Sequence, residues 1–366
     1  MEKDFVIMAT RSMRSYASRV LEHILKYKSF ADYGESINGV SALHTDRFAD
    51  GEMEVVLNKS IRGKVAVLFS AASRNEAGIN VEEAKIEQYH TIDVLARSQA
   101  KKIIVFEPYV SCSRSDRTTR RSSVGLWVHF KTLASLGVNH IVTYQLHSDK
   151  SKSILDPTLC VLDDIDAFNL LSKYICDKYI KTKAVLDDVV RKEWAFCSVD
   201  SGGEKIARFF ANSFGTQLVV AHKQRDYSKA NTIESINILS AVPIEGKKLW
   251  IVDDMIDTAG SAESLVYALA QYHPAEINLM AVHAPFSAPA EQRLMKLHEK
   301  GLLNHLIVSD TVHGLPSMPL AMPNLEIVSS AQLSANIIWN IITNHSMTDI
   351  RQSFNTADYL SKPGLF

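Results

Sequence analysis

Short apolar runs alternate with helical patterns along most of this 366-residue chain, and this alternation restricts the fold more than any other feature. Runs such as Lys64–Phe69 and Leu249–Val252 are rich in β-branched residues and apolar at consecutive positions. Strands of this kind are buried on both faces, as in parallel sheets covered by helices. Further candidate strands are Lys102–Phe106, Ile141–Tyr144, Ala195–Val199, Leu218–Val220, Asn278–Val282 and His305–Val308. The alternation predicts an α/β fold with mainly parallel sheets.

The length of the chain favours two domains, because a domain has roughly 150 residues. Apolar residues three and four apart, the spacing of a helix face, recur in both halves. They lie at 167–175, 206–214, 265–269 and 333–341. Pro157 interrupts the chain between the halves. We therefore predict a first domain at residues 1–160, a similar second domain at 161–344 and a polar tail at 345–366.

The composition argues against several classes of function. The net charge is −1, so no global basic field attracts nucleic acid or anionic lipid. The four cysteines are widely spaced and form no CxxC pair, which argues against a cysteine zinc site and a disulfide framework. The N-terminus lacks the apolar core of a secretory signal, and no apolar run approaches the roughly 20 residues that span a bilayer. We expect a cytoplasmic protein.

Three acidic residues follow the predicted strand Leu249–Val252. Asp253 and Asp254 come directly at its end, where open α/β sheets bind ligands. The next loop leads into a helix, and its backbone N–H groups favour a phosphate. This loop contains Asp257, Thr258, Ala259, Gly260 and Ser261. Because carboxylates accept hydrogen bonds from vicinal hydroxyls, the pattern predicts a sugar phosphate with its diol on the two strand-end acids. A single helix-capping Asp would not account for three acids.

The stretch Val252–Ser261, VDDMIDTAGS, resembles the phosphoribosyl-pyrophosphate-binding fingerprint of the type I phosphoribosyltransferase fold. Its residues DMIDTAG are similar to those of the ribose-phosphate pyrophosphokinases, the synthetases that make phosphoribosyl pyrophosphate. Other motifs of that family follow in the same order from about residue 46 to 313. The resemblance implies two similar phosphoribosyltransferase-type domains. It also implies transfer of the diphosphoryl group of ATP to the C1 hydroxyl of ribose 5-phosphate.

Residues 46–52, DRFADGE, resemble a segment that reaches the ATP site of a neighbouring subunit in this family. The matching positions are Phe48, Asp50 and Glu52. Without the resemblance, the same residues could form only a polar turn before a strand.

Residues 108–123, PYVSCSRSDRTTRRSS, resemble the segment that grips ATP, with Arg114, Asp116 and Arg117 at matching positions. Dense arginines suit a polyphosphate because each guanidinium presents a fork of donors. A solvated basic loop is the alternative. Ser115 stands where the family has Gln, and residues 118–123 lack the family's usual proline.

Two further segments resemble the family's magnesium-associated motifs. Residues 144–147 read YQLH and residues 198–203 read SVDSGG. The matching residues are His147 and Asp200, while Gln145 replaces an aspartate. A hydrogen-bonded structural histidine is the alternative for the first of them.

Residues 221–226, AHKQRD, resemble the segment assigned to transition-state stabilisation, with Lys223 and Arg225 at matching positions. Two cations spaced by one residue project to the same side of an extended segment. An exposed basic edge is the alternative.

The resemblance implies Mg²⁺ as cofactor, ATP and ribose 5-phosphate as ligands, and a homo-oligomer built from dimers, with a hexamer as the usual form. Two other functions stay open. Ser115, Gln145 and the altered loop 118–123 would suit a non-catalytic, synthetase-like regulatory subunit. A phosphoribosyltransferase that uses phosphoribosyl pyrophosphate would share Val252–Ser261, but would not account for the ATP-related segments.

Overall fold

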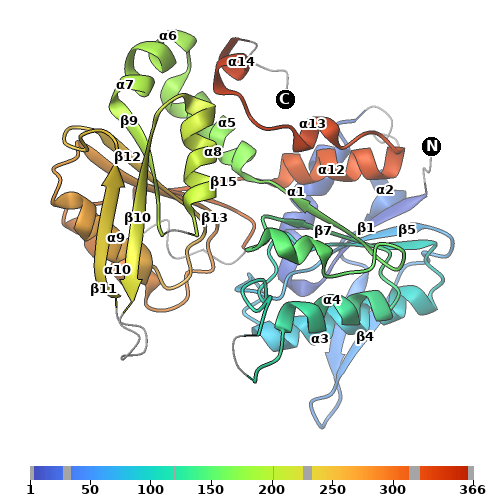
Figure 1. Ribbon diagram of the computed structural model, residues 1–366. Helices are drawn as coiled ribbons and strands as arrows, with labels where there is room; N and C mark the ends of the chain where they lie inside the picture. The colour runs from blue at the N-terminus through green and yellow to red at the C-terminus, as the bar shows by residue number, and fades with distance from the viewer. Residues whose placement is uncertain are drawn as a thin grey trace. The chain divides into compact units, whose positions relative to one another are not determined.

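The computed structural model describes six segments of the chain, which divides into two compact units. The described segments are residues 4–27, 34–118, 121–200, 202–225, 233–312 and 322–361. Each unit is built on one large sheet flanked by helices (Figure 1). The first comprises residues 1–166, 311–315 and 329–352, and the second 167–310, 316–328 and 353–366. Across the described segments, every helix is too short or too polar to cross a membrane.

The first unit contains a six-stranded sheet in the order β2-β1-β5-β6-β7-β8, with parallel pairing throughout. Its strands are β1 (Phe5–Ala9), β2 (Asn38–Gly39), β5 (Val65–Phe69), β6 (Lys102–Phe106), β7 (His140–Tyr144) and β8 (Val161–Ile165). Strands β1 and β5 are buried at every position, as their uninterrupted apolar runs require. The helices and turns before the second unit are η1 (Arg11–Met13), α1 (Arg14–Ile24), α2 (Gly34–Ile37), α3 (Val81–Arg97), α4 (Gly125–Ser135) and η3 (Asp149–Ser153).

Helices cover both faces of this first sheet (Figure 1). On one face, Ile92 of α3 and Phe130 of α4 belong to one apolar core with Leu68 and Val105 of the strands. Helices α1 and α12 (Ala331–Thr343) cover the other face. There the hydroxyl of Tyr16 lies 2.7 Å from the hydroxyls of both Ser330 and Ser334. The sheet is therefore enclosed, which leaves its strand ends for polar residues.

The second unit contains a seven-stranded sheet in the order β11-β10-β9-β12-β13-β14-β15. Every pair is parallel except β10 with β11. The strands are β9 (Trp194–Ser198), β10 (Gln217–Arg225), β11 (Ile233–Ser240), β12 (Lys248–Met255), β13 (Glu276–His283), β14 (His305–Ser309) and β15 (Leu325–Val328). The helices are α5 (Phe168–Ile175), η4 (Cys176–Ile180), α6 (Lys183–Val185), η5 (Leu186–Val190), α7 (Arg191–Glu193), α8 (Glu204–Phe214), α9 (Gly260–Ala270), α10 (Ala290–Glu299) and α14 (Thr356–Ser361). The prediction of two domains with mainly parallel sheets flanked by helices is confirmed.

The strands that the sequence did not reveal lie mostly at the edges of the two sheets. Strands β2 and β8 form the edges of the first sheet, and β11 and β15 form those of the second. An edge strand has a neighbour on one side only, and β8 accordingly carries two acidic residues in its run VLDDI. Strand β1 is interior and fully buried, and it was overlooked despite its apolar run.

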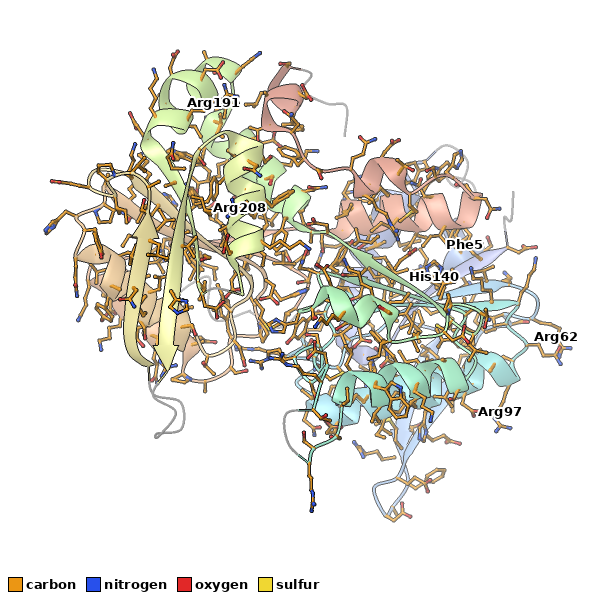
Figure 2. The ribbon with its side chains drawn as sticks, viewed as in Figure 1. Phe5, Arg62, Arg97, His140, Arg191 and Arg208 are labelled. Atoms are coloured by element: carbon orange, nitrogen blue, oxygen red, sulfur yellow. The ribbon has the colours of Figure 1, made fainter. Side chains whose placement is uncertain are left out.

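The helix α12 joins the first unit, although the sequence assigned it to the second domain. Its Trp339 stacks on Tyr27, with ring centroids 4.5 Å apart. The segment that was expected to form a tail is shared. In the first unit, Arg351 of α13 (Thr348–Arg351) pairs with Asp163. Asp163 also accepts a hydrogen bond of 2.9 Å from His140, a residue labelled in Figure 2. In the second unit, Tyr359 of α14 donates to Asp177 at 2.7 Å.

Candidate functional site

Asp253 and Asp254 lie near the carboxyl end of β12, which pairs with β9 up to Val252 and Ser198. The backbone N–H of Asp254 donates to Oδ1 of Asp253 at 2.9 Å, and the side chain of Asp254 is almost fully buried. Burial raises the pKa of Asp253 well above its ordinary value, and the charge of Asp254 raises it further. Asp200, which follows β9, also raises it. Three carboxylates therefore influence one another at two adjacent strand ends.

The loop Asp257–Ser261 connects β12 to α9, which begins at Gly260. Ala259 precedes the helix with φ +58°, a left-handed conformation that costs a non-glycine residue energy. The N–H groups of a first helical turn have no partner within the helix, so they are available to an anion. The side chains of Thr258 and Ser261 are exposed beside them. This local geometry agrees with what a phosphate would need.

Asp200 begins the turn between β9 and α8. Its Oδ1 accepts hydrogen bonds from the backbone N–H groups of Gly202 at 2.9 Å and Gly203 at 3.1 Å. These bonds fix the direction of the carboxylate.

Lys223 and Arg225 lie on β10, opposite Ile236 and Ile233 of β11. A register shift between Gln224 and Arg225 interrupts the regular alternation of a strand. The sequence argument that both cations project to one side assumed that alternation. The side chains of residues 223–225 lie outside the described part of the structure.

A pocket of about 420 Å³ lies within the first unit. It brings together four residues that the sequence singled out, namely Arg114, Asp116 and Arg117 of the expected ATP segment and His147 after β7. Its lining also includes Ser148, and Lys150 of η3. The three cationic side chains suit a polyphosphate. Ser148 and Lys150 were missed, although their position just beyond a strand end was a usable signal.

The loop that supplies Arg114 and Asp116 is closed at its base by Ser115. The Oγ of Ser115 accepts a hydrogen bond of 2.9 Å from the backbone N–H of Gly125, the first residue of α4. Its backbone oxygen accepts another of 3.2 Å from the N–H of Leu126. The serine that departs from the family pattern thus connects the loop to the helix that follows it. Of the altered stretch 118–123, residues 119 and 120 lie outside the described residues.

Phe48, Asp50 and Glu52 lie together in the turn of a hairpin formed by β3 (Leu43–Arg47) and β4 (Met53–Leu57). The hairpin projects from the first unit (Figure 1), and Phe48 is 53% exposed. The N–H of Glu52 donates to Oδ1 of Asp50 at 3.1 Å. The structure therefore presents an aromatic ring and two acids outward.

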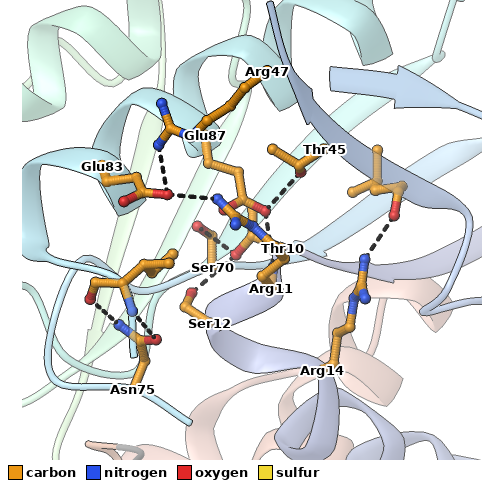
Figure 3. A network of polar contacts seen from close by, with 12 residues as sticks. Thr10, Arg11, Ser12, Arg14, Thr45, Arg47, Ser70, Asn75, Glu83 and Glu87 are labelled. Carbon is orange, nitrogen blue, oxygen red and sulfur yellow. Dashed lines mark hydrogen bonds and ion pairs between the residues drawn. The ribbon is translucent and has the colours of Figure 1, made fainter. Parts of the chain in front are cut away.

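A network of charged side chains attaches this hairpin to α3 (Figure 3). Arg47 pairs with Glu83 at 2.8 Å, and Thr45 donates to Glu87 at 3.2 Å. Arg11 pairs with both glutamates at 3.0 Å. Burial alone would raise the pKa of Glu83, but the guanidinium groups of Arg47 and Arg11 outweigh it and lower the pKa. The network fixes the base of the hairpin.

His147 and Asp200, the expected metal ligands, lie in the first and the second unit respectively. Within the described ranges, no group of three or more His, Cys, Asp or Glu side chains is arranged to hold a metal ion by itself.

Comparison with known proteins adds to this geometry. A model of the N-terminal domain of ribose phosphate pyrophosphokinase matches residues 5–137, and a phosphoribosyl transferase domain model matches residues 174–305. The ribose-phosphate pyrophosphokinase of Fusobacterium nucleatum is 31% identical over 305 residues, which cover 83% of this chain and 88% of the relative. That of Mycoplasma genitalium is 29% identical, over 80% and 81% of the two chains. The crystal structure of the phosphoribosylpyrophosphate synthetase from Mycobacterium smegmatis is similar with a TM-score of 0.76 and 26% identity, and the match covers 93% of this chain and 100% of that one.

Proposed function

This chain belongs to the ribose-phosphate pyrophosphokinase family, and we propose that it transfers the diphosphoryl group of ATP to the C1 hydroxyl of ribose 5-phosphate, giving phosphoribosyl pyrophosphate and AMP. The chain has two phosphoribosyltransferase-type domains, as the predicted fold class requires, although the bounds of the two compact units differ from the predicted ones. The observation that carries the proposal is the end of β12, where two acids stand beside a helix-forming loop with available N–H groups. A sugar phosphate has a diol that the two acids can bind and a phosphate that the loop N–H groups can bind.

The ribose 5-phosphate site is assigned to Asp253, Asp254 and the loop Asp257–Ser261. The loop N–H groups bind the phosphate, and the two carboxylates accept hydrogen bonds from the diol. Because both ends of the sugar are held, the C1 hydroxyl is presented in one orientation, and such positioning contributes several kcal/mol in favourable systems.

The nucleotide is assigned to the pocket of the first unit. Arg114, Arg117 and Lys150 neutralise the polyphosphate there. Asp116 accepts hydrogen bonds from nucleotide groups beside it. We assign the exposed hairpin residues Phe48, Asp50 and Glu52 to the ATP site of a neighbouring subunit, which makes the protein a homo-oligomer built from dimers. Light scattering after size-exclusion chromatography measures that state, and a strictly monomeric active enzyme would contradict it.

We assign to Lys223 and Arg225 the stabilisation of the negative charge that develops on the transferred phosphates. We assign His147 and Asp200 as the residues that hold Mg²⁺. A carboxylate whose direction is fixed by two backbone N–H groups, and an exposed imidazole, fit a metal that takes its remaining ligands from phosphates and water. When bound, Mg²⁺ supplies neutralisation of the phosphate oxygens.

The test is direct. Purified protein is mixed with ribose 5-phosphate, ATP and Mg²⁺, and AMP and phosphoribosyl pyrophosphate are followed by phosphorus NMR. Equal appearance of both products supports the proposal. Binding of ribose 5-phosphate without turnover would favour the non-catalytic regulatory subunit, and activity with a nucleobase but without ATP would favour a phosphoribosyltransferase.

A further inference from the structure

Arg293 of α10 reaches the loop that we assign to the sugar phosphate. Its Nη1 donates a hydrogen bond of 2.9 Å to the backbone oxygen of Thr258. Its Nε lies 3.1 Å from Oε2 of Glu263, in the first turn of α9. One guanidinium thus connects the loop and the helix that follows it. The sequence motifs did not include this residue.

The segment that leads into α10 is joined to the residue that precedes this loop. The backbone N–H of Ile256 donates to the oxygen of His283 at 2.9 Å, and the N–H of Phe286 donates to the oxygen of Ile256 at 3.2 Å. These bonds tie the β12–α9 connection to the β13–α10 connection. The side chain of Arg293 is 34% exposed, so it is held by its partners while part of it still faces solvent.

The guanidinium also lies against the backbone at the start of α9. A Cβ placed on Gly260 would be only 3.0 Å from Nη1 of Arg293. Gly260 is the first residue of α9, where N–H groups point toward a bound anion. The two described contacts use two of the five N–H groups that a guanidinium carries. A positive charge therefore stands beside the expected phosphate position.

Two physical requirements of the loop are met by this arginine. Ala259 is left-handed, and such a conformation persists only where the surrounding structure holds it. The bond from Arg293 to Thr258 holds the peptide that immediately precedes Ala259. In addition, Glu263 would repel an anion at the start of α9, and its ion pair with Arg293 offsets that repulsion.

We propose that Arg293 is a positioning residue for ribose 5-phosphate, which keeps the loop Asp257–Ser261 in its anion-binding form and neutralises Glu263 beside the phosphate. The inference rests on the proposed function, because that function identifies the ligand of the loop. It adds a residue from a different helix to the site. It also predicts that Arg293 contributes to the affinity for ribose 5-phosphate but not to the affinity for the nucleotide.

The test compares Arg293→Ala with wild type in two measurements. Calorimetry gives the dissociation constant of ribose 5-phosphate without ATP, and steady-state kinetics gives KM for each substrate. Loss of a hydrogen bond made by a charged group predicts a rise of about tenfold in the dissociation constant and KM of ribose 5-phosphate. KM for ATP should stay within about twofold. Arg293→Lys keeps the charge but not the fork, so its rise should be smaller.

Arg208→Ala provides the matched control. Arg208 lies on α8 of the same unit (Figure 2) and pairs with Glu204 of its own helix, away from the loop in the chain. Arg208→Ala should change neither the dissociation constant of ribose 5-phosphate nor KM for either substrate. Thermal melting of each variant shows whether the fold is retained, and Arg293→Lys serves if Arg293→Ala does not fold.

The outcomes separate this inference from the proposed function. Unchanged binding of ribose 5-phosphate by folded Arg293→Ala overturns the role of Arg293, whatever the turnover of wild type. Wild type could bind ribose 5-phosphate but make no phosphoribosyl pyrophosphate. If Arg293→Ala then binds ribose 5-phosphate more weakly than wild type does, the role of Arg293 is supported and the synthetase activity is overturned. A wild type that does not bind ribose 5-phosphate overturns both. An equal rise in KM for ATP would show a general structural effect and overturn the positioning role.

Discussion

Glu107 and His129 form a buried pair whose disruption should destabilise the first unit strongly. The two side chains are 0% and 2% exposed, and Nε2 of His129 lies 2.9 Å from Oε2 of Glu107. The hydroxyl of Tyr89 lies 3.0 Å from Nδ1 of the same ring. Burial, followed by the charge of Glu107, raises the pKa of Tyr89 to about 12, so this hydroxyl keeps its proton at neutral pH. The pair joins the residue after β6 to α4, across the base of the loop that carries Arg114.

Replacing His129 by Leu leaves the carboxylate buried, with only a long contact of 3.4 Å from Gln88 among its described hydrogen bonds. Removing one member of a buried ion pair costs about 3–5 kcal/mol. A domain is stable by only about 5–15 kcal/mol, so the loss should be plain. The double variant Glu107→Leu with His129→Leu removes both polar side chains. It should cost about 1–2 kcal/mol, because the hydroxyl of Tyr89 and the amide of Gln88 then lose their partners.

Urea unfolding followed by tryptophan fluorescence measures both variants. Trp127, which lies on α4 two residues before His129, contributes to this signal together with three other tryptophans. With a slope of about 2–3 kcal/mol per M, the single variant should lower the midpoint by about 1–2 M. The double variant should recover most of that loss. Equal destabilisation by the single and double variants would refute the reasoning, because it would mean that the carboxylate is not the source of the cost.

Two further predictions concern the proposed site, and a third concerns the thiol of Cys112. Asp253 has a raised pKa because of burial and Asp254, so its protonated form stabilises the fold at low pH and this contribution is lost as pH rises through that pKa. Ribose 5-phosphate should bind more tightly as Asp253 deprotonates, because the carboxylate accepts hydrogen bonds from the diol. Asp254→Asn should weaken binding but move this rise in affinity to lower pH, because it removes a charge that raises the pKa of Asp253. Calorimetry across pH measures the affinity, and an unshifted profile would contradict the prediction. Lys223→Ala should lower kcat by about 100-fold with KM changed much less, as measured by steady-state kinetics; an intact kcat would remove the catalytic assignment. The thiol of Cys112 should react slowly with iodoacetamide at pH 7.5, because burial and then Glu107 raise its pKa to about 12 and the thiolate is the reactive form; rapid labelling, detected by mass spectrometry, would be inconsistent with this.

Apart from β1, the interior strands of both sheets could be predicted, because a strand buried on two faces is apolar at consecutive positions. Strands β5, β6 and β12 were found in this way, within one or a few residues of their observed bounds. The edge strands β8 and β15 have polar positions, since one side of each faces no strand, and their pattern is close to that of a loop.

The α/β class, the family and the acids and loop at Val252–Ser261 could be read from the sequence alone, because a strand, its end and the next helix follow one another within a short stretch. The contact of Arg293 with Thr258, 35 residues away, and that of Tyr16 with Ser334, 318 residues away, could be seen only in the folded chain. Periodicity and strand ends are local properties of a chain. The contact of one side chain with a distant element depends on how whole helices and sheets pack, and no short stretch of sequence records that.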